Sequence, residues 1–162
     1  MRFLVLFLYL FSFLIQAAQS DVAMDPRAKV ASAQLISCSN GVNGAKVLTL
    51  GFRVKLDDDW KTYWSSPGLA GAPPSIDWQD SKNLTSVQWL WPTPKRMMVY
   101  DVETYGYKHE VIFPLLVTVT DTSKPLEIAA KATLLVCREV CIRTQMDIAL
   151  TLPASGTAVD LA

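Results

Sequence analysis

The sequence predicts an all-β fold, an antiparallel immunoglobulin-like β-sandwich of about eight or nine strands. Three observations predict it. Apolar and polar residues alternate with a period of two in several stretches, and clusters of turn-forming residues separate these stretches. No segment shows the 3.6-residue apolar period of an amphipathic helix. Many short strands joined by tight turns are typical of a sandwich of two facing sheets.

The first residues predict an export signal rather than a part of the fold. An apolar run from Phe3 to Ile15 follows one arginine, and small and polar residues lead on to Ser20. This is the layout of a cleaved signal peptide, and the run is shorter than the roughly 20 apolar residues that span a membrane. We therefore expect a signal peptide at 1–20, one domain at 21–152 and a flexible C-terminal tail at 153–162.

Four stretches of the mature chain alternate strongly enough to predict individual strands. The apolar residues of each stretch share one parity, so one face of each strand is expected to point into a core. Clusters of Gly, Pro, Asn, Asp and Ser between the stretches predict loops. The predicted strands are 46–56, 110–120, 126–136 and 144–152, and the predicted loops are 39–44, 57–59, 65–74, 91–96 and 121–125.

The charge balance argues against two classes of binding protein. The chain has 15 basic and 15 acidic residues and no net charge. Nucleic-acid-binding proteins and polybasic membrane-surface proteins carry an excess of positive charge, so we expect neither activity. No second long apolar stretch follows the signal, and we expect the mature chain to be soluble. An exported chain meets an oxidising compartment, in which paired cysteines can form a disulfide.

Two of the three cysteines lie close together in the stretch LLVCREVCIR. Cys137 is expected to end one strand and Cys141 to begin the next, so that the residues between them form a hairpin tip. A purely structural disulfide across so short a ring would add only about 2 kcal/mol, near the low end for disulfides. Cys38 is the odd third cysteine, and we expect it to be a small, partly buried residue without a role.

Two chemical interpretations of the pair stay open from the residues alone. As ligands of Cu(I), the two sulfurs could be joined by Met97, Met98 and His109, which would make the chain a copper-binding protein. As a redox pair, an accessible short ring at a loop tip suits thiol–disulfide exchange, which requires no organic cofactor or metal. In that case Arg138 would favour the thiolate form of a neighbouring cysteine.

A set of motifs in a fixed order resembles one protein family. The motifs are WKTYW at 60–64, PGLAGAPP at 67–74, WPTPKR at 91–96, TYGY at 104–107 and the cysteine pair. With these motifs, about residues 30–152 resemble the periplasmic N-terminal domain of the DsbD thiol:disulfide interchange protein family, in particular its ScsB-like (suppressor of copper sensitivity) branch.

The resemblance implies an immunoglobulin-like domain with an exposed redox pair in a bacterial periplasm. Such a domain acts as a protein-disulfide reductase component. It receives electrons from a DsbD- or ScsB-like membrane donor and passes them to thioredoxin-fold periplasmic proteins. Cys137 and Cys141 match the redox cysteines of the family, and the resemblance implies that Cys141 forms the mixed disulfide.

The resemblance also implies a cap loop over the cysteines, at 100–108. Tyr105 and Tyr107 are the expected shielding residues, with Glu103 as a nearby proton acceptor. Two features depart from the family pattern. DsbD itself spaces its cysteines more widely, and family members usually continue into a multi-helix membrane domain and a thioredoxin-like domain. We therefore expect this chain to work with a separate membrane partner. If such partners are lost, we expect it to be a redox-silent interaction module.

Overall fold

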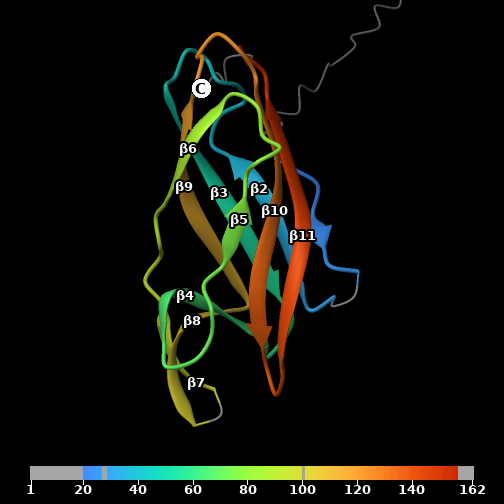
Figure 1. The fold of residues 1–162 in the computed structure, drawn as a ribbon, viewed down its shortest axis with the longest axis vertical. Helices are drawn as coiled ribbons and strands as arrows, with labels where there is room; N and C mark the ends of the chain where they lie inside the picture. Colours follow the sequence, from blue (N-terminus) through green and yellow to red (C-terminus); the bar gives the residue numbers. More distant parts are fainter. Residues whose placement is uncertain (1–19, 27–28, 100, 157–162) are drawn as a thin grey trace, which may run out of the picture.

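The described part of the chain is a sandwich of two antiparallel β-sheets. A computed structural model describes residues 20–26, 29–99 and 101–156 (Figure 1). All strand pairings within these residues are antiparallel. The prediction of an all-β immunoglobulin-like fold is confirmed. The predicted signal peptide lies outside the described residues except for Ser20, and so does the predicted tail beyond residue 156.

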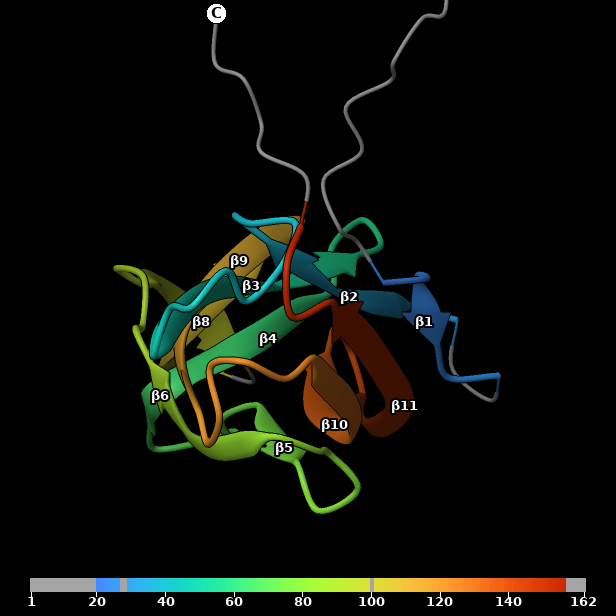
Figure 2. The same ribbon diagram turned by 90° about the horizontal axis from the view of Figure 1, so that it is seen from above.

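One sheet contains five strands in the order β1-β2-β3-β9-β6. Seen from above, β2, β3 and β9 lie on one side of the sandwich, and β5, β10 and β11 lie on the other (Figure 2). The strands of the first sheet are β1 (Ala23–Met24), β2 (Ala31–Ser37), β3 (Val47–Leu56), β6 (Leu84–Trp89) and β9 (Glu110–Val119).

The second sheet contains six strands, five of them in the order β11-β10-β4-β8-β7, with β5 paired to β10. Strand β10 therefore has β11 along one side. Along its other side lie β4 at Cys137, β5 at residues 131–133 and an isolated bridge from Lys82 to Glu127. The strands of this sheet are β4 (Lys61–Gly68), β5 (Ser75–Asp77), β7 (Lys95–Val99), β8 (Val102–Lys108), β10 (Leu126–Cys137) and β11 (Cys141–Leu152).

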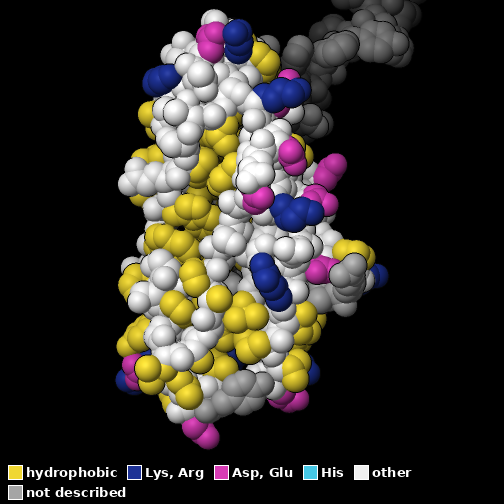
Figure 3. Space-filling model, viewed as in Figure 1, with side chains coloured by type: hydrophobic (Ala, Val, Ile, Leu, Met, Phe, Trp, Pro, Cys, Tyr) yellow, Lys and Arg dark blue, Asp and Glu magenta, His cyan; other side chains and the backbone are white. Residues whose placement is uncertain are grey.

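The hydrophobic core lies between the two sheets. It is formed by the alternate apolar residues that the sequence predicts to be buried. On the four predicted strands, every second residue is buried, and all of these residues are apolar except Thr144. Phe113 of β9 is fully buried in an aromatic cluster, and its ring centroid lies 5.1 Å from that of Tyr107 and 5.3 Å from that of Trp91. In Figure 3, charged side chains are scattered over the side of the molecule on which Figure 1 shows β10 and β11.

The described residues form eleven strands, where the sequence predicted eight or nine. The difference comes from short strands, since β1 has two residues and β5 has three. Segments so short cannot display an alternating pattern, and only their pairing with β2 and β10 defines them as strands. Two predicted loops are also shorter than expected, because β4 continues to Gly68 and β7 already begins at Lys95.

The hairpin of β10 and β11 runs along most of the long axis of the molecule. Its tip lies at the lower end in Figure 1, near the labels of β4, β7 and β8. At the opposite end, the chain after β11 is bound to the loop before β3, because the Val42 and Asn43 amides donate to the carbonyl oxygens of Pro153 and Ala154. Within the described residues, no helix long and apolar enough to cross a bilayer was found.

Candidate functional site

Cys137 and Cys141 form a disulfide at the tip of the β10–β11 hairpin. Their sulfurs are 2.05 Å apart and their Cα atoms are 4.1 Å apart. Cys137 is the last residue of β10 and Cys141 is the first of β11, and the two residues lie directly opposite each other in the ladder. The three turn residues between them are all exposed. The predicted placement of the pair at a hairpin tip is therefore confirmed.

The two cysteines differ in their access to solvent. Cys137 has no exposed surface (0%), whereas Cys141 is an exposed residue. Strand parity explains part of this difference. Leu134 and Val136 point into the core, so Cys137 points to the outer face of its sheet, where it is buried by other parts of the chain rather than by the main core. A reactant that approaches from solvent therefore meets Cys141 first.

The side chain that contacts Cys137 is Tyr63 of β4. The Tyr63 hydroxyl donates a hydrogen bond to Cys137 Sγ at 3.0 Å and lies 4.0 Å from Cys141 Sγ. Tyr63 is fully buried, yet it does not belong to the main core cluster. Tyr63 and Cys137 thus form a small buried site on the outer face of the sheet, with a hydroxyl donor aimed at the sulfur.

Strand β4 is held against the end of β10 by two interactions next to Tyr63. Lys61 pairs with Cys137 across the two strands. The hydroxyl of Thr62, which is fully buried, donates to the carbonyl oxygen of Leu135 at 3.1 Å. These interactions fix the register in which the Tyr63 ring reaches the sulfur, because a shift by one residue would turn that side chain to the other face.

The predicted shielding residues lie in strand β8, and their hydroxyls have partners other than sulfur. The Tyr105 hydroxyl donates to Glu103 at 2.6 Å, and this hydrogen bond raises the pKa of Tyr105 above its usual value. The Tyr107 hydroxyl donates to the carbonyl oxygen of Pro92 at 2.8 Å, and its ring packs on Phe113 in the core. Burial raises the pKa of Tyr107 to about 12.

Arg138, expected to tune the thiolates, is exposed in the hairpin turn. Its guanidinium carbon lies 5.8 Å from the centroid of the Trp60 ring, within the range of a cation–π interaction. The Trp60 ring therefore positions the Arg138 guanidinium beside the hairpin. The Arg138 backbone lies in the turn that joins the two cysteines, and its guanidinium lies over the Trp60 ring.

The residues considered as copper ligands are divided between buried and exposed positions. Met97 is buried (7% exposed), whereas Met98 is exposed (56%) and its carbonyl oxygen accepts a hydrogen bond from Lys61. His109 lies in the turn between β8 and β9 with a positive φ of 62°. No cluster of three or more His, Cys, Asp or Glu side chains suited to a metal was found in the described part of the chain. Copper binding by this set stays a prediction.

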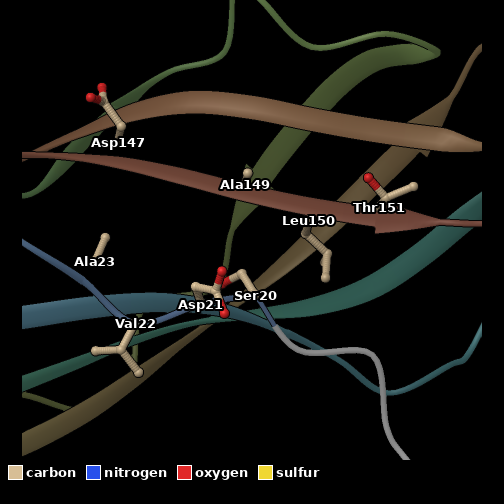
Figure 4. A pocket seen from close by; sticks show the side chains of 8 residues that line it. All are labelled: Ser20, Asp21, Val22, Ala23, Asp147, Ala149, Leu150 and Thr151. Atoms are coloured by element: carbon tan, nitrogen blue, oxygen red, sulfur yellow. The ribbon is translucent and has the colours of Figure 1, made fainter.

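Two further features lie apart from the disulfide. Cys38 is an exposed free thiol, so the expectation that it is partly buried was wrong. A cavity of about 510 Å³ lies between the N-terminal segment and β11, and its lining includes the carboxylates of Asp21 and Asp147 (Figure 4). The lining begins six residues along β11 from Cys141, and none of the predicted site residues contributes to it.

Tyr63 is the site residue that the sequence reasoning did not find. It lies in the WKTYW motif, whose resemblance to the family does not by itself single out the tyrosine as a partner of sulfur. The contact joins residues 74 positions apart, and no local pattern encodes such a separation. Parity alone places Lys61 and Tyr63 on one face of β4, and only the pairing of Lys61 with Cys137 in the structure brings that face to the disulfide.

One protein-family model and several solved structures match this chain. The family model for the N-terminal domain of the thiol:disulfide interchange protein DsbD matches residues 26–153. Among solved structures, the N-terminal periplasmic domain of ScsB from Proteus mirabilis is 30% identical with a TM-score of 0.67, over 86% of this chain and 52% of that one. The reduced N-terminal domain of DsbD from Neisseria meningitidis is 13% identical with a TM-score of 0.43, over 76% of this chain and 87% of that one.

The extent of these matches differs between the two solved structures. This chain spans about half the length of the ScsB domain structure. No curated protein sequence matches the chain.

Proposed function

The chain belongs to the DsbD N-terminal domain family, and on that premise we propose that it is a thiol–disulfide exchange domain whose Cys137–Cys141 pair cycles between disulfide and dithiol. One observation supports this function above all. The pair lies at a hairpin tip with Cys141 exposed, while Cys137 is buried beneath a hydroxyl donor. A disulfide that serves stability alone needs neither an exposed sulfur nor a donor on its partner.

The first step is attack on the exposed sulfur. An incoming thiolate from a partner dithiol attacks Cys141 Sγ and forms a mixed disulfide with it. The Cys137–Cys141 bond breaks, and its electron pair leaves on Cys137 as a thiolate. The Tyr63 hydroxyl, 3.0 Å from this sulfur, stabilises the departing charge by a hydrogen bond to it.

The second step returns the pair to a dithiol. The second thiolate of the partner attacks the partner's own sulfur in the mixed disulfide, and Cys141 leaves as a thiolate. The partner becomes a disulfide, and two electrons have passed to Cys137 and Cys141, which take up protons from solvent. The reverse sequence passes both electrons on to another disulfide. Arg138, in the turn between the cysteines, favours the thiolate forms.

The partners follow from the family, not from any contact in this chain. We propose a membrane protein of the DsbD or ScsB kind as the electron donor and thioredoxin-fold proteins as acceptors. The relevant compartment is the periplasm, as in the ScsB structure, whose domain is described as periplasmic. Export by a signal peptide at 1–20, a domain at 21–152 and a flexible tail at 153–162 are parts of the same proposal.

The cap role of Glu103, Tyr105 and Tyr107 also stays a prediction. The Tyr105 hydroxyl donates to Glu103, which also accepts from Arg96, and the Tyr107 hydroxyl donates to the Pro92 carbonyl oxygen. A direct contact with sulfur would therefore require a rearrangement of β8. Tyr63 already occupies the place next to Cys137. The proposal therefore depends on Tyr63 and does not require the predicted cap.

The reduction potential of the pair tests the proposed function. Mature protein with Cys38→Ser, which removes the third thiol, is equilibrated with glutathione or dithiothreitol buffers. We expect a potential between about −120 and −270 mV, the range of known exchange proteins. A potential below about −300 mV is typical of structural disulfides and would contradict the proposal. As a second arm, the Cys141 thiolate of Cys137→Ser should attack the disulfide of an oxidised thioredoxin-fold protein and form a mixed disulfide with it, while the electron pair leaves on the second sulfur of that protein.

A further inference from the structure

The Tyr63 ring is covered by the segment that follows β4. Residues 68–74, here called the strap, begin where Gly68 pairs with Thr104 of β8. The strap ends before Ser75, which pairs with Thr133 of β10. Since β4 lies between β8 and β10 in the sheet, the strap crosses the outer face of β4. That is the face from which Tyr63 reaches the disulfide.

Gly71 is the point at which the strap contacts Tyr63. A Cβ atom built on Gly71 would overlap Cδ1 and Cε1 of the Tyr63 ring, so only a glycine lets the backbone approach this closely. Gly71 also has a positive φ of 105°, and Gly68 has a φ of 95°. The backbone of Gly71 thus lies directly against one side of the ring that donates to Cys137.

Gly44 serves as a comparison, because it shares the positive φ of Gly71 but not its contact with a side chain. Gly44 has a positive φ of 76°, but a Cβ atom on Gly44 would meet nothing within 4 Å. Both positions favour glycine for conformational reasons. Only Gly71 requires it for a contact with a residue at the redox site.

We propose that the strap fixes the Tyr63 hydroxyl on Cys137, and that Gly71 is a positioning residue for exchange at the disulfide. This inference rests on the proposed function, because it concerns the leaving sulfur of the exchange step. With the ring held, the hydroxyl is in place when the bond breaks and the electron pair arrives on Cys137. With the strap displaced, the ring turns away and Cys137 leaves without its donor.

The first experiment compares glycine substitutions in the Cys38→Ser protein. Opening of the disulfide by dithiothreitol is followed by acid quenching, maleimide labelling and mass spectrometry. We expect Gly71→Ala to slow opening by about tenfold, the factor that a hydrogen bond to a charged acceptor contributes. Gly44→Ala, the matched control with the same kind of backbone strain, should leave the rate unchanged.

A double mutant tests whether Gly71 acts through Tyr63. Tyr63→Phe alone should slow opening to the level of Gly71→Ala, and the combination should be no slower than either single variant. Independent losses that multiply would overturn the inference, because they would mean that the strap acts by another route.

The pKa of the Cys137 thiol is a second measurement, and a loss of stability alone would not change it. In a Cys38→Ser, Cys141→Ser background, ¹³Cβ-labelled Cys137 is titrated by NMR. We expect Gly71→Ala to raise the Cys137 pKa as Tyr63→Phe does, since both remove the donor from the thiolate. An unchanged pKa in Gly71→Ala would overturn the inference.

If Gly71→Ala does not fold, a variant that introduces no steric overlap can replace it in the same tests. Pro73→Gly with Pro74→Gly adds no atom to the strap but gives its backbone more freedom. We expect a slower opening and a raised Cys137 pKa in this variant as well. Normal values in it would contradict the strap role. Failure of the proposed function is a separate result, because it would appear as an abnormally low potential in the parent protein.

Discussion

The hydroxyl oxygen of Tyr63 lies 3.0 Å from Cys137 Sγ, and the two residues are 74 positions apart in the sequence. Both residues are fully buried outside the main core, whereas Cys141, the other half of the disulfide, is exposed. The site is therefore asymmetric: one cysteine is exposed, and the sulfur of the other is buried beside a hydroxyl donor. The proposed function assigns the attacked sulfur to Cys141 and the leaving sulfur to Cys137.

The two thiols should differ in reactivity when each is left alone. In the Cys38→Ser background, Cys137→Ser leaves the exposed Cys141, and Cys141→Ser leaves the buried Cys137. We expect iodoacetamide to alkylate Cys141 faster by on the order of tenfold, because access limits the reaction of the buried sulfur. Mass spectrometry of timed samples measures both rates. Equal rates, or a faster reaction at Cys137, would reverse the assigned roles.

Removal of the Tyr63 hydroxyl should slow exchange without unfolding the domain. Tyr63→Phe keeps the ring under the strap and deletes only the donor to Cys137. We expect the rate of reduction by a thioredoxin-fold dithiol to fall by about tenfold, since a charge-assisted hydrogen bond contributes that factor. Thr85→Val removes a hydroxyl of β6 that bonds to Thr120 at 2.9 Å; it is the control and should retain the parental rate. A normal rate in Tyr63→Phe would remove this residue from the mechanism.

Alkaline pH should destabilise the fold through Tyr107. Burial raises its pKa from 10.0 to about 12, so the unfolded chain loses this proton at a lower pH than the folded chain. The contribution to stability is fully present below pH 10 and declines as the pH rises toward 12. Urea unfolding at several pH values measures the decline. Tyr107→Phe should show a shallower decline, and one as steep as in the parent would refute this origin.

The core should depend on Phe113 far more than on its sequence neighbour. Phe113 is fully buried and contacts four aromatic rings, so Phe113→Ala should lower the free energy of unfolding by about 3–5 kcal/mol. Ile112 is adjacent in β9, points to the opposite face and is 41% exposed. Ile112→Ala should therefore lose about 1 kcal/mol or less. Chemical denaturation of both variants measures the difference, and similar losses would contradict this packing.

Much of the fold was predictable because its signals are local. The alternation in 46–56, 110–120, 126–136 and 144–152 matches β3, β9, β10 and β11 to within a few residues at the ends. A strand that is buried on one face must alternate, whatever its neighbours are. The hairpin tip was equally predictable, since Cys137 and Cys141 are joined by a three-residue turn and pair with each other.

The short strands and strand β8 were not predictable in the same way. Strands β1 and β5 are too short to alternate, and only the edges of β2 and β10 define them. The segment 100–108 was read as a cap loop, but its residues from Val102 onward form strand β8. Residue 100 lies outside the described residues. The aromatic residues of β8 follow strand parity, which turns Tyr107 into the core.

The main strands of the two sheets, the buried face of each strand and the closeness of the two cysteines can be derived from the sequence. These properties follow from backbone period and chain connectivity, which act over a few residues. The tertiary structure alone decided which sulfur is buried, that Tyr63 is its donor, and that Gly71 lies against the ring. These contacts arise when β4, β10 and the strap meet on one face of a sheet, and their geometry depends on the register of strands that are distant in the chain.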